Sequence, residues 1–271
     1  MKNSSKIIWA IALIVIVVLI GVLVFGYYKK INLKIDNPVA TMEVENFGTI
    51  KLELYPDQAP QTVSNFIALA NRGFYDGLTF HRIIKDFMIQ GGDPNGDGTG
   101  SAKISNLKDD GEDTKYTIKG EFSANNVKNT VKMEEGTLAM ARSDYTKKSS
   151  SLTEESYNSG SCQFFIVTKA ASYLNGQYTG FGKVIQGLDV VHKIEEVEVK
   201  AADTSSDAES SSNSEASTPV NPPKITSIRV ETNGVDYGLP ETLTPFDYTS
   251  WMYKQYGIDP SSLSTTTTVD E

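Results

Sequence analysis

Cysteine and histidine are scarce in this sequence of 271 residues, which contains one cysteine and two histidines. A single cysteine cannot close an intrachain disulfide. Because Cys162 adjoins Gln163, we expect it to be a small buried residue rather than a nucleophile. Neither His81 nor His192 has a carboxylate partner at the spacing of a hydrolase motif, which argues against a serine-histidine-aspartate site.

Basic residues are outnumbered, with 25 Lys and Arg against 34 Asp and Glu and a net charge of −9. This excess of negative charge argues against nucleic acid as a partner. Metal-binding patterns are also sparse. The segment 93–98 matches the first half of a calcium loop, but Ile104 occupies the position of the bidentate glutamate. We therefore predict no metal and no cofactor, and interpret the segment as a glycine-rich turn.

Long apolar runs are missing except at the N-terminus, where 19 residues from Ile7 to Phe25 are apolar. At about 1.5 Å per residue they would extend roughly 28 Å, close to the ~30 Å hydrocarbon core of a bilayer. Lysines flank the run, and no convincing cleavage site follows it. The pattern predicts an uncleaved signal anchor, with a removed signal peptide as the alternative. We expect a single-pass protein of the cell membrane whose large domain is extracytoplasmic.

Short strands and two helices are predicted along the rest of the chain. Apolar and polar residues alternate over 40–55, which is typical of a β-hairpin. Apolar residues recur at i, i+3, i+4 and i+7 from Val63 between a proline at 60 and a glycine at 73, which predicts an amphipathic helix. A second helix is expected from Leu188 to about Glu196.

Two segments interrupt this pattern. Residues 143–160 are rich in Ser, Tyr, Lys and Glu, and residues 201–222 begin with Ser, Ala and acidic residues. The second segment has too little apolar surface to become ordered. The predicted organisation is a cytoplasmic tail 1–6, a transmembrane anchor 7–28, a linker 29–38, a main domain 39–232 with an insertion at 143–160 and a disordered insertion at 201–222, and a C-terminal tail 233–271.

The densest pattern is the stretch 80–93, FHRIIKDFMIQGGD. We interpret it as two strands joined by a turn at 85–86. The two-residue period of a strand gives three pairs that share a face: Arg82 with Ile84, Phe87 with Ile89, and Met88 with Gln90.

This stretch resembles the signature of the cyclophilin-type peptidyl-prolyl cis-trans isomerases. Further matching blocks follow in order: GTLAMA from Gly136, SCQFFI from Ser161, YLNG from Tyr173 and FGKV from Phe181. The resemblance covers 39–200 and a last strand near 225–230, and it suggests a bacterial membrane-anchored form. It implies a mainly β fold, a closed antiparallel eight-stranded barrel capped by two α-helices.

Rotation about an Xaa-Pro bond crosses a barrier of ~18–20 kcal/mol without making or breaking a bond, so it needs no nucleophile, metal or cofactor. Arg82 can donate to the prolyl nitrogen as that atom loses conjugation, an interaction stronger in the transition state. Gln90 and Gln163 can hydrogen-bond the substrate backbone. The resemblance implies catalytic roles for Arg82 and Gln90, and substrate contacts for Phe87, Met88, Gln163, Phe165, Tyr173, Leu174, Tyr178, Ala141 and Arg142.

The sequence departs from the family pattern on one side of the site. Tyr173 stands where a Trp is common and Tyr178 where a His is common, which makes cyclosporin binding doubtful. Arg142 and Ser143 replace a small neutral pair and bring the 143–160 insertion beside the groove for the residues before proline.

We predict an isomerase (rotamase) that assists the folding of secreted or surface proteins, with proline-containing polypeptides as clients and a membrane contact through the N-terminal helix. Two alternatives remain open. One is a non-catalytic proline-recognising binding or chaperone module on the membrane surface. The other is a surface attachment protein that acts through its acidic insert and aromatic tail.

Overall fold

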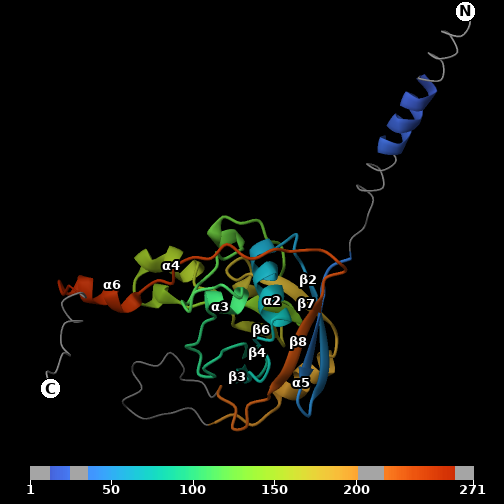
Figure 1. Ribbon diagram of the computed structural model, residues 1–271. Coiled ribbons are helices and arrows are strands. Elements are labelled where there is room, and N and C mark those ends of the chain that lie inside the picture. The colour runs from blue at the N-terminus through green and yellow to red at the C-terminus, as the bar shows by residue number, and fades with distance from the viewer. Residues whose placement is uncertain (1–12, 25–35, 201–216, 260–271) are drawn as a thin grey trace, which may run out of the picture. The chain divides into compact units, whose positions relative to one another are not determined.

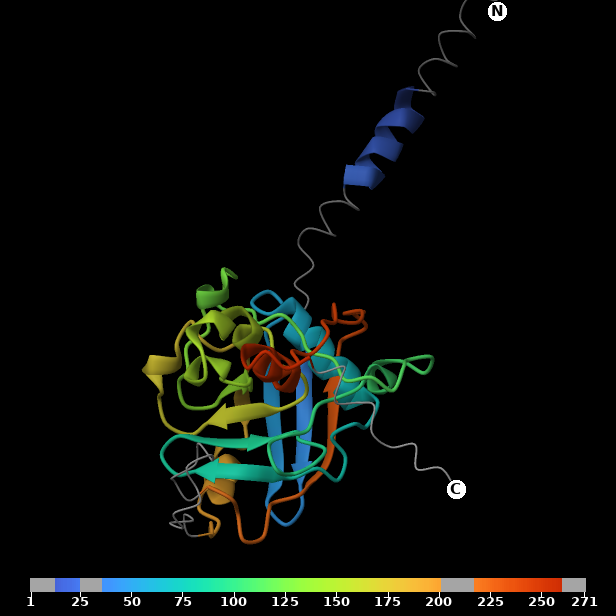
Figure 2. The same cartoon turned by 90° about the vertical axis from the view of Figure 1, so that its left-hand side faces the viewer.

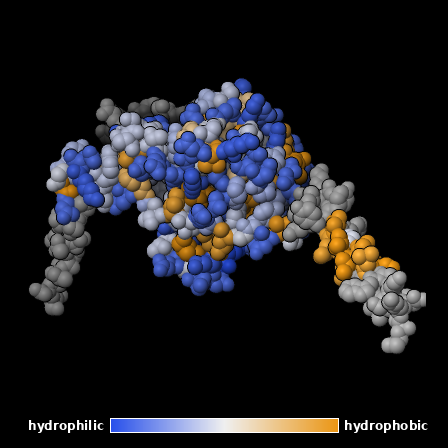
Figure 3. All heavy atoms as spheres, turned by 90° about the horizontal axis from the view of Figure 1, so that it is seen from above, coloured by the Kyte–Doolittle hydropathy of each residue, from blue (hydrophilic) through white to orange (hydrophobic). Residues whose placement is uncertain are grey.

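The computed structural model describes residues 13–24, 36–200 and 217–259 and divides into two compact units, Met1–Asp36 and Asn37–Glu271. Each unit is considered separately. In the first, residues 13–24 form a helix, which is hydrophobic along its length (Figure 3). In the second, the face in view is mostly hydrophilic, in keeping with the many charged residues (Figure 3).

The predicted single-pass membrane location with an extracytoplasmic domain is wrong. None of the helices in the three described ranges is long and apolar enough to cross a membrane. The remainder of the predicted span, 7–12 and 25–28, lies outside the described residues.

Eight antiparallel strands form one curled sheet in the second unit. Along the sheet the order is β3-β4-β6-β5-β7-β2-β1-β8, and in Figure 2 β3, β4 and β6 run across the direction of β1, β2 and β8. The predicted hairpin at 40–55 is present as β1 and β2, paired from Val39 opposite Glu53 onward. The strands are β1 Val39–Val44, β2 Gly48–Leu54, β3 Phe80–Ile84, β4 Met88–Gly91, β5 Thr137–Met140, β6 Phe164–Val167, β7 Gly180–Gln186 and β8 Ile225–Glu231.

The sheet is an open half-barrel, which corrects the prediction of a closed barrel. Between its end strands, β3 and β8, the described residues form one isolated bridge, Thr79 to Lys224. Three backbone bonds at this seam are Phe80 N to Pro223 O at 2.9 Å, Ile225 N to Leu78 O at 2.7 Å and Gly77 N to Ile225 O at 2.8 Å. Pro222 and Pro223 precede β8 and have no N–H to donate, so a ladder cannot continue through them.

The two predicted helices are present as α2, Pro60–Asn71, and α5, Leu188–Glu195. Helix α2 buries its apolar stripe, including Val63 and Phe66, in the main core. Its N-cap residue offers no side-chain hydrogen bond. Glu121, far along the chain, accepts instead from the N–H groups of Gln61 at 3.0 Å and Thr62 at 2.8 Å. A carboxylate at this end also interacts favourably with the helix dipole.

Three further α-helices lie outside the two-helix prediction: α3 Ile104–Leu107, α4 Thr153–Tyr157 and α6 Tyr248–Gln255. Helix α4 belongs to the 143–160 insertion and α6 to the C-terminal tail, and Figure 1 shows them at the same end of the unit. In the predicted disordered insertion, residues 201–216 lie outside the described residues. Residues 217–222 pair with the segment before the insertion, through Lys200 N to Thr218 O and Val220 N to Glu198 O.

Candidate active site

The β3–β4 hairpin positions the polar centre of the site. Arg82 lies opposite Gln90, and Ile84 lies opposite Met88. On the other face of the hairpin, Ile83 and Ile89 are buried in the main core. The predicted pairs Arg82 with Ile84 and Met88 with Gln90 therefore share a face, as the strand period requires.

Phe87 does not share a face with Ile89, contrary to the prediction. It precedes β4, which begins at Met88, and Asp86 before it has a positive φ of 58°. This left-handed turn residue breaks the alternation, so Phe87 packs with the second apolar cluster, which includes Met88 and Phe165, instead of the main core.

A chain of hydrogen bonds connects the three polar side chains of the site. Arg82 Nη1 donates to Gln90 Oε1 at 3.3 Å and lies 3.8 Å from Met88 Sδ. Gln90 Nε2 donates to Gln163 Oε1 at 3.0 Å. Gln163 Nε2 in turn donates to the carbonyl oxygens of Gly98 at 3.0 Å and Gly100 at 2.9 Å. Each amide is thereby oriented by its neighbour, and the guanidinium is held beside them.

A cavity of about 190 Å³, lined mostly by apolar and aromatic residues, opens beside this chain, and we call it the first pocket. Phe165 is buried at its base and meets Tyr178 edge to face, with ring centroids 5.7 Å apart. The residues that line it are nine of the eleven predicted ones: Arg82, Phe87, Met88, Gln90, Ala141, Arg142, Phe165, Leu174 and Tyr178.

Gln163 and Tyr173 do not line the first pocket. Gln163 lines a neighbouring cavity of about 270 Å³, the second pocket. Tyr173 is 66% exposed, and its ring centroid lies 6.1 Å from that of Phe87. Tyr178, in contrast, lines the first pocket, at a position where the family pattern commonly has a His.

Arg142 borders both pockets, but its charge is held against aromatic rings. The guanidinium carbon lies 4.5 Å from the ring centroid of Tyr178 and 5.2 Å from that of Tyr157. Nη1 donates to Ser156 Oγ at 2.8 Å. Arg142 thus attaches helix α4 of the insertion to the wall of the first pocket through cation–π contacts and a hydrogen bond.

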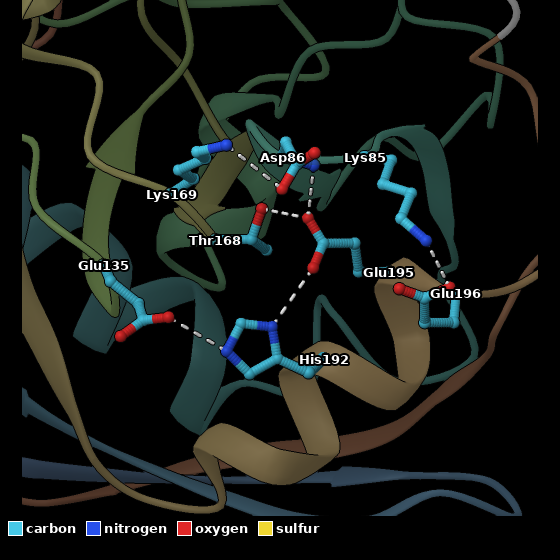
Figure 4. A network of polar contacts seen from close by, with 8 residues as sticks. All are labelled: Lys85, Asp86, Glu135, Thr168, Lys169, His192, Glu195 and Glu196. Atoms are coloured by element: carbon cyan, nitrogen blue, oxygen red, sulfur yellow. Dashed lines mark hydrogen bonds and ion pairs between the residues drawn. The ribbon is translucent and has the colours of Figure 1, made fainter.

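A polar network under the hairpin fixes the turn that carries Phe87 (Figure 4). The carboxylate of Glu195, on α5, accepts from Asp86 N at 2.8 Å and from the hydroxyl of Thr168. Thr168 N also donates to Phe87 O at 2.9 Å. The buried carboxylate therefore holds the turn directly at Asp86, and Thr168, which it also engages, holds the turn at Phe87.

His192 completes this network, which the sequence argument missed. Its ring nitrogens lie 3.1 Å from Glu195 Oε2 and 3.1 Å from Glu135 Oε1 (Figure 4). The hydrogen bond with Glu195, followed by the two carboxylate charges, raises the pKa of His192 despite partial burial. The spacing of His192 and Glu195, three residues apart on one helix, was a usable local signal. Glu135 lies too far away in sequence to be recognised.

The remaining chemically notable side chains are buried away from the first pocket. Cys162 is fully buried, as predicted, and burial raises the pKa of its thiol to about 12. His81 is also buried, and desolvation lowers its pKa. The carboxylate of Asp93 accepts from the N–H groups of Asn95, Asp97 and Gly98, so it closes its own turn. Within the described ranges, no group of three or more His, Cys, Asp or Glu residues could hold a metal ion.

Comparison with known proteins agrees with this arrangement. Residues 39–230 match the family model described as cyclophilin type peptidyl-prolyl cis-trans isomerase/CLD. The chain is 37% identical over 177 residues to peptidyl-prolyl cis-trans isomerase-like 2 of Rhizopus delemar, covering 65% of this chain and 28% of that protein. It is 42% identical over 157 residues to peptidyl-prolyl cis-trans isomerase 9 of Schizosaccharomyces pombe, covering 58% of this chain and 22% of that protein. The chain therefore spans about a quarter of the length of these two relatives.

A relative that the match covers for most of its length is peptidyl-prolyl cis-trans isomerase B of Bacillus subtilis, 42% identical over 146 residues, or 54% of this chain and 82% of that protein. Among solved structures, a cyclophilin type peptidyl-prolyl cis-trans isomerase of Cryptosporidium parvum, determined in the presence of the dipeptide Ala-Pro, aligns with a TM-score of 0.54 and 27% identity. The alignment covers 72% of this chain and 99% of the Cryptosporidium chain. The chain belongs to the cyclophilin-type peptidyl-prolyl cis-trans isomerase family.

Proposed function

We propose that this protein accelerates cis-trans isomerisation of Xaa-Pro bonds in polypeptides. The observation that carries the proposal is the position of Arg82, whose guanidinium is hydrogen-bonded to Gln90 at the rim of the first pocket. The lining is mostly apolar and aromatic, and of its two cations Arg142 is engaged with Tyr178 and Ser156, so the cavity suits a proline ring whose nitrogen faces Arg82.

The mechanism needs three contributions from these residues. Phe87, Met88 and Phe165 would hold the prolyl ring in the first pocket by burying apolar surface. Arg82 would donate to the prolyl nitrogen when the amide twists and its lone pair is freed from conjugation. Since this bond forms fully only in the twisted state, it lowers the barrier rather than merely tightening binding.

The polar side chains beside Arg82 would keep the peptide in register. Gln90 is held between Arg82 and Gln163, so its amide is already oriented when substrate arrives. A preoriented group costs little reorganisation in the transition state. The side-chain oxygen and nitrogen of Gln163 are both hydrogen-bonded to protein groups. This supports a role for Gln163 in orienting Gln90, in addition to any contact with the substrate peptide.

The clients that fit this site are polypeptides with accessible prolines, and the natural role would be assistance in folding. The related Cryptosporidium structure, determined in the presence of Ala-Pro, supports this substrate class. The narrower expectation of secreted or surface clients depended on the predicted membrane location. The proposed clients are therefore polypeptides with accessible Xaa-Pro bonds, without regard to compartment. We expect weak cyclosporin binding, because Tyr178 lines the first pocket and Tyr173 is largely exposed beside it.

The test is cis-trans exchange of an Ala-Phe-Pro-type peptide, followed by NMR with the full chain. Arg82→Ala is expected to lower the catalysed exchange rate by about 100-fold, the usual loss when one transition-state donor is removed. Arg72→Ala is the matched control, since Arg72 pairs with Asp109 at the surface and its loss should leave exchange unchanged. If the intact protein binds the peptide but exchange stays at the uncatalysed rate, the non-catalytic binding module is the correct function instead.

A further inference from the structure

His192 bridges two carboxylates that come from different parts of the fold. Its Nδ1 lies 3.1 Å from Oε2 of Glu195, on the same helix, and its Nε2 lies 3.1 Å from Oε1 of Glu135, which precedes β5 (Figure 4). An ionised carboxylate only accepts hydrogen bonds, and a neutral imidazole carries a single N–H. Both contacts are hydrogen bonds at the same time only when the ring is doubly protonated. The arrangement therefore fits an imidazolium.

The other charged groups around this network are paired with one another. These pairs are Lys85 with Glu196, Lys169 with Asp86, Lys193 with Asp189 and Lys183 with Glu134, at 2.6, 3.4, 2.9 and 4.0 Å. The hydrogen bond with Glu195 is the largest influence on the pKa of His192, and it raises that pKa against the effect of partial burial. The charges of Glu195 and Glu135 act in the same direction.

Glu195 connects the ring to the turn between β3 and β4 because its two oxygens face different partners. Oε2 faces His192, whereas Oε1 accepts from Asp86 N at 2.8 Å and from the hydroxyl of Thr168 (Figure 4). A carboxylate is planar, so one oxygen cannot swing away without moving the other. The Glu195 side chain is 7% exposed, so water does not easily replace a lost partner. A contact that fixes Oε2 therefore also aims Oε1 at the turn.

The turn in turn carries Phe87 to the first pocket. Asp86 has a φ of 58°, a left-handed conformation that costs free energy in a non-glycine residue and persists when its surroundings stabilise it. Phe87 follows directly and lines the first pocket, and its carbonyl oxygen accepts from Thr168 N at 2.9 Å. If Glu195 is aimed less firmly at Asp86 and Thr168, Phe87 is positioned less firmly as well.

Loss of the ring proton weakens this support in either tautomer of His192. If the remaining N–H faces Glu135, a nitrogen lone pair faces the buried oxygen of Glu195. If it faces Glu195, the hydrogen bond survives without the positive charge that makes such bonds roughly twice as strong. Glu135, whose side chain is 51% exposed, can then turn to water. In both cases Glu195 is held less firmly above the folded-state pKa of His192 than below it.

We propose that His192 is a positioning residue for the isomerase. Its protonated ring holds Glu195 against the turn that carries Phe87, so that turnover is most efficient while His192 keeps its proton. The effect acts through the turn, since the residues that line the first pocket do not include His192. This inference rests on the proposed function, because it assigns a regulation by pH to the same site.

The experiment measures kcat/KM for exchange of an Ala-Phe-Pro-type peptide by NMR, with the full chain, from about pH 5.5 to about pH 9. The peptide is blocked at both ends so that it does not titrate. For the intact protein, kcat/KM should fall about twofold through one inflection as pH rises, the size of one partly exposed ion pair. His192→Gln should give a flat profile. Lys193→Gln, the next residue on α5 with a side chain that is 62% exposed, is the matched control and should keep the inflection.

A second readout does not need catalysis. The amide resonance of Asp86, whose N–H donates to Glu195, should titrate in the intact protein with the midpoint of the kcat/KM profile, and should not titrate in His192→Gln. Glu135→Gln should move both midpoints to lower pH, because the ring loses one of the charges that raise its pKa. A role of His192 in packing alone predicts no such movement.

The two readouts separate the inference from the proposed function. If the Asp86 amide follows the titration of His192 but the peptide exchanges no faster than in buffer at any pH, the link to the turn is supported and the proposed function is overturned. If exchange is rapid but the inflection is absent, or persists in His192→Gln, the positioning role is overturned and catalysis is supported. An Asp86 amide that ignores the titration of His192 would also overturn the role.

Discussion

The two pockets lie side by side and share three residues, but they are built in different ways. The first takes its polar edge and base from β3, β4 and β6, which are neighbours in one ladder. The second takes its outer wall from the insertion 143–160 and from the C-terminal segment 236–256, which contact each other through aromatic rings. A two-bond bridge ties the C-terminal segment to the domain. A ladder fixes every residue through its neighbours, whereas loops are fixed only where a side chain anchors them. The difference predicts that the first pocket is the more rigid of the two.

The strongest test of the rigid first pocket removes the support under its turn. Glu195→Ala leaves two donors without their acceptor, the partly buried Asp86 N and the buried Thr168 hydroxyl. The free energy of unfolding should fall by about 2 kcal/mol, and kcat/KM should fall with it because Phe87 loses its fixed backbone. Urea unfolding and peptide exchange measure the two effects.

The neighbouring Glu196→Ala is the matched control, since Glu196 pairs with Lys85 at the surface. It should leave both quantities nearly unchanged. If Glu195→Ala lowers stability but not kcat/KM, the first pocket does not depend on its turn. The two pockets would then differ less in how their residues are held in place.

A smaller effect is expected from the residue that joins the two pockets. Arg142→Lys keeps the charge but loses the planar group that lies over Tyr178 and Tyr157. About 1 kcal/mol of local stability should be lost. Backbone amide hydrogen exchange should become faster over 143–160 and stay unchanged in β4 and β6. Faster exchange in those strands as well would mean that the pockets are one cooperative unit.

The smallest effect concerns pH. The pKa of His192 is raised above its ordinary value by Glu195 and Glu135, so its protonated form stabilises the folded state. This contribution is complete below the ordinary pKa and is lost as pH rises through the folded-state pKa. Because the side chain is 41% exposed, it is worth about 0.5 kcal/mol or less.

Urea unfolding of the intact protein and of His192→Gln checks this at about pH 5 and about pH 8.5. The free energy of unfolding of the intact protein should exceed that of the variant at the lower pH only. An equal difference at both values would show that His192 acts by packing rather than by charge.

The sequence was sufficient for the parts of the molecule in which neighbours along the chain decide the structure. Alternation predicted the β1–β2 hairpin, and the helical period with a proline at its start predicted α2. The resemblance supplied the site residues, and of the nine that line one cavity, six lie in a strand or one residue from a strand. The assignment of Phe87 to a strand face failed because Asp86 takes a left-handed conformation.

The rest depended on residues that meet only in three dimensions. Glu121 caps α2 from about sixty positions away, and Glu135 reaches His192 from a similar distance. No local period marks such pairs. The C-terminal segment 236–256 looked like a tail without a task, since the contacts of Phe246 and Tyr248 with Tyr145 of the insertion join residues about a hundred positions apart.

The pairing of β1 with the last strand, β8, has a consequence for the order in which the protein can be made. Strand β1 pairs with β2 on one side and with β8 on the other, although β8 is synthesised almost at the end of the domain. Until β8 leaves the ribosome, β1 has a row of unpaired backbone groups along one edge. An exposed edge strand is a template for unwanted pairing between chains. A member of a family named for prolyl isomerisation therefore passes through a vulnerable nascent state of its own.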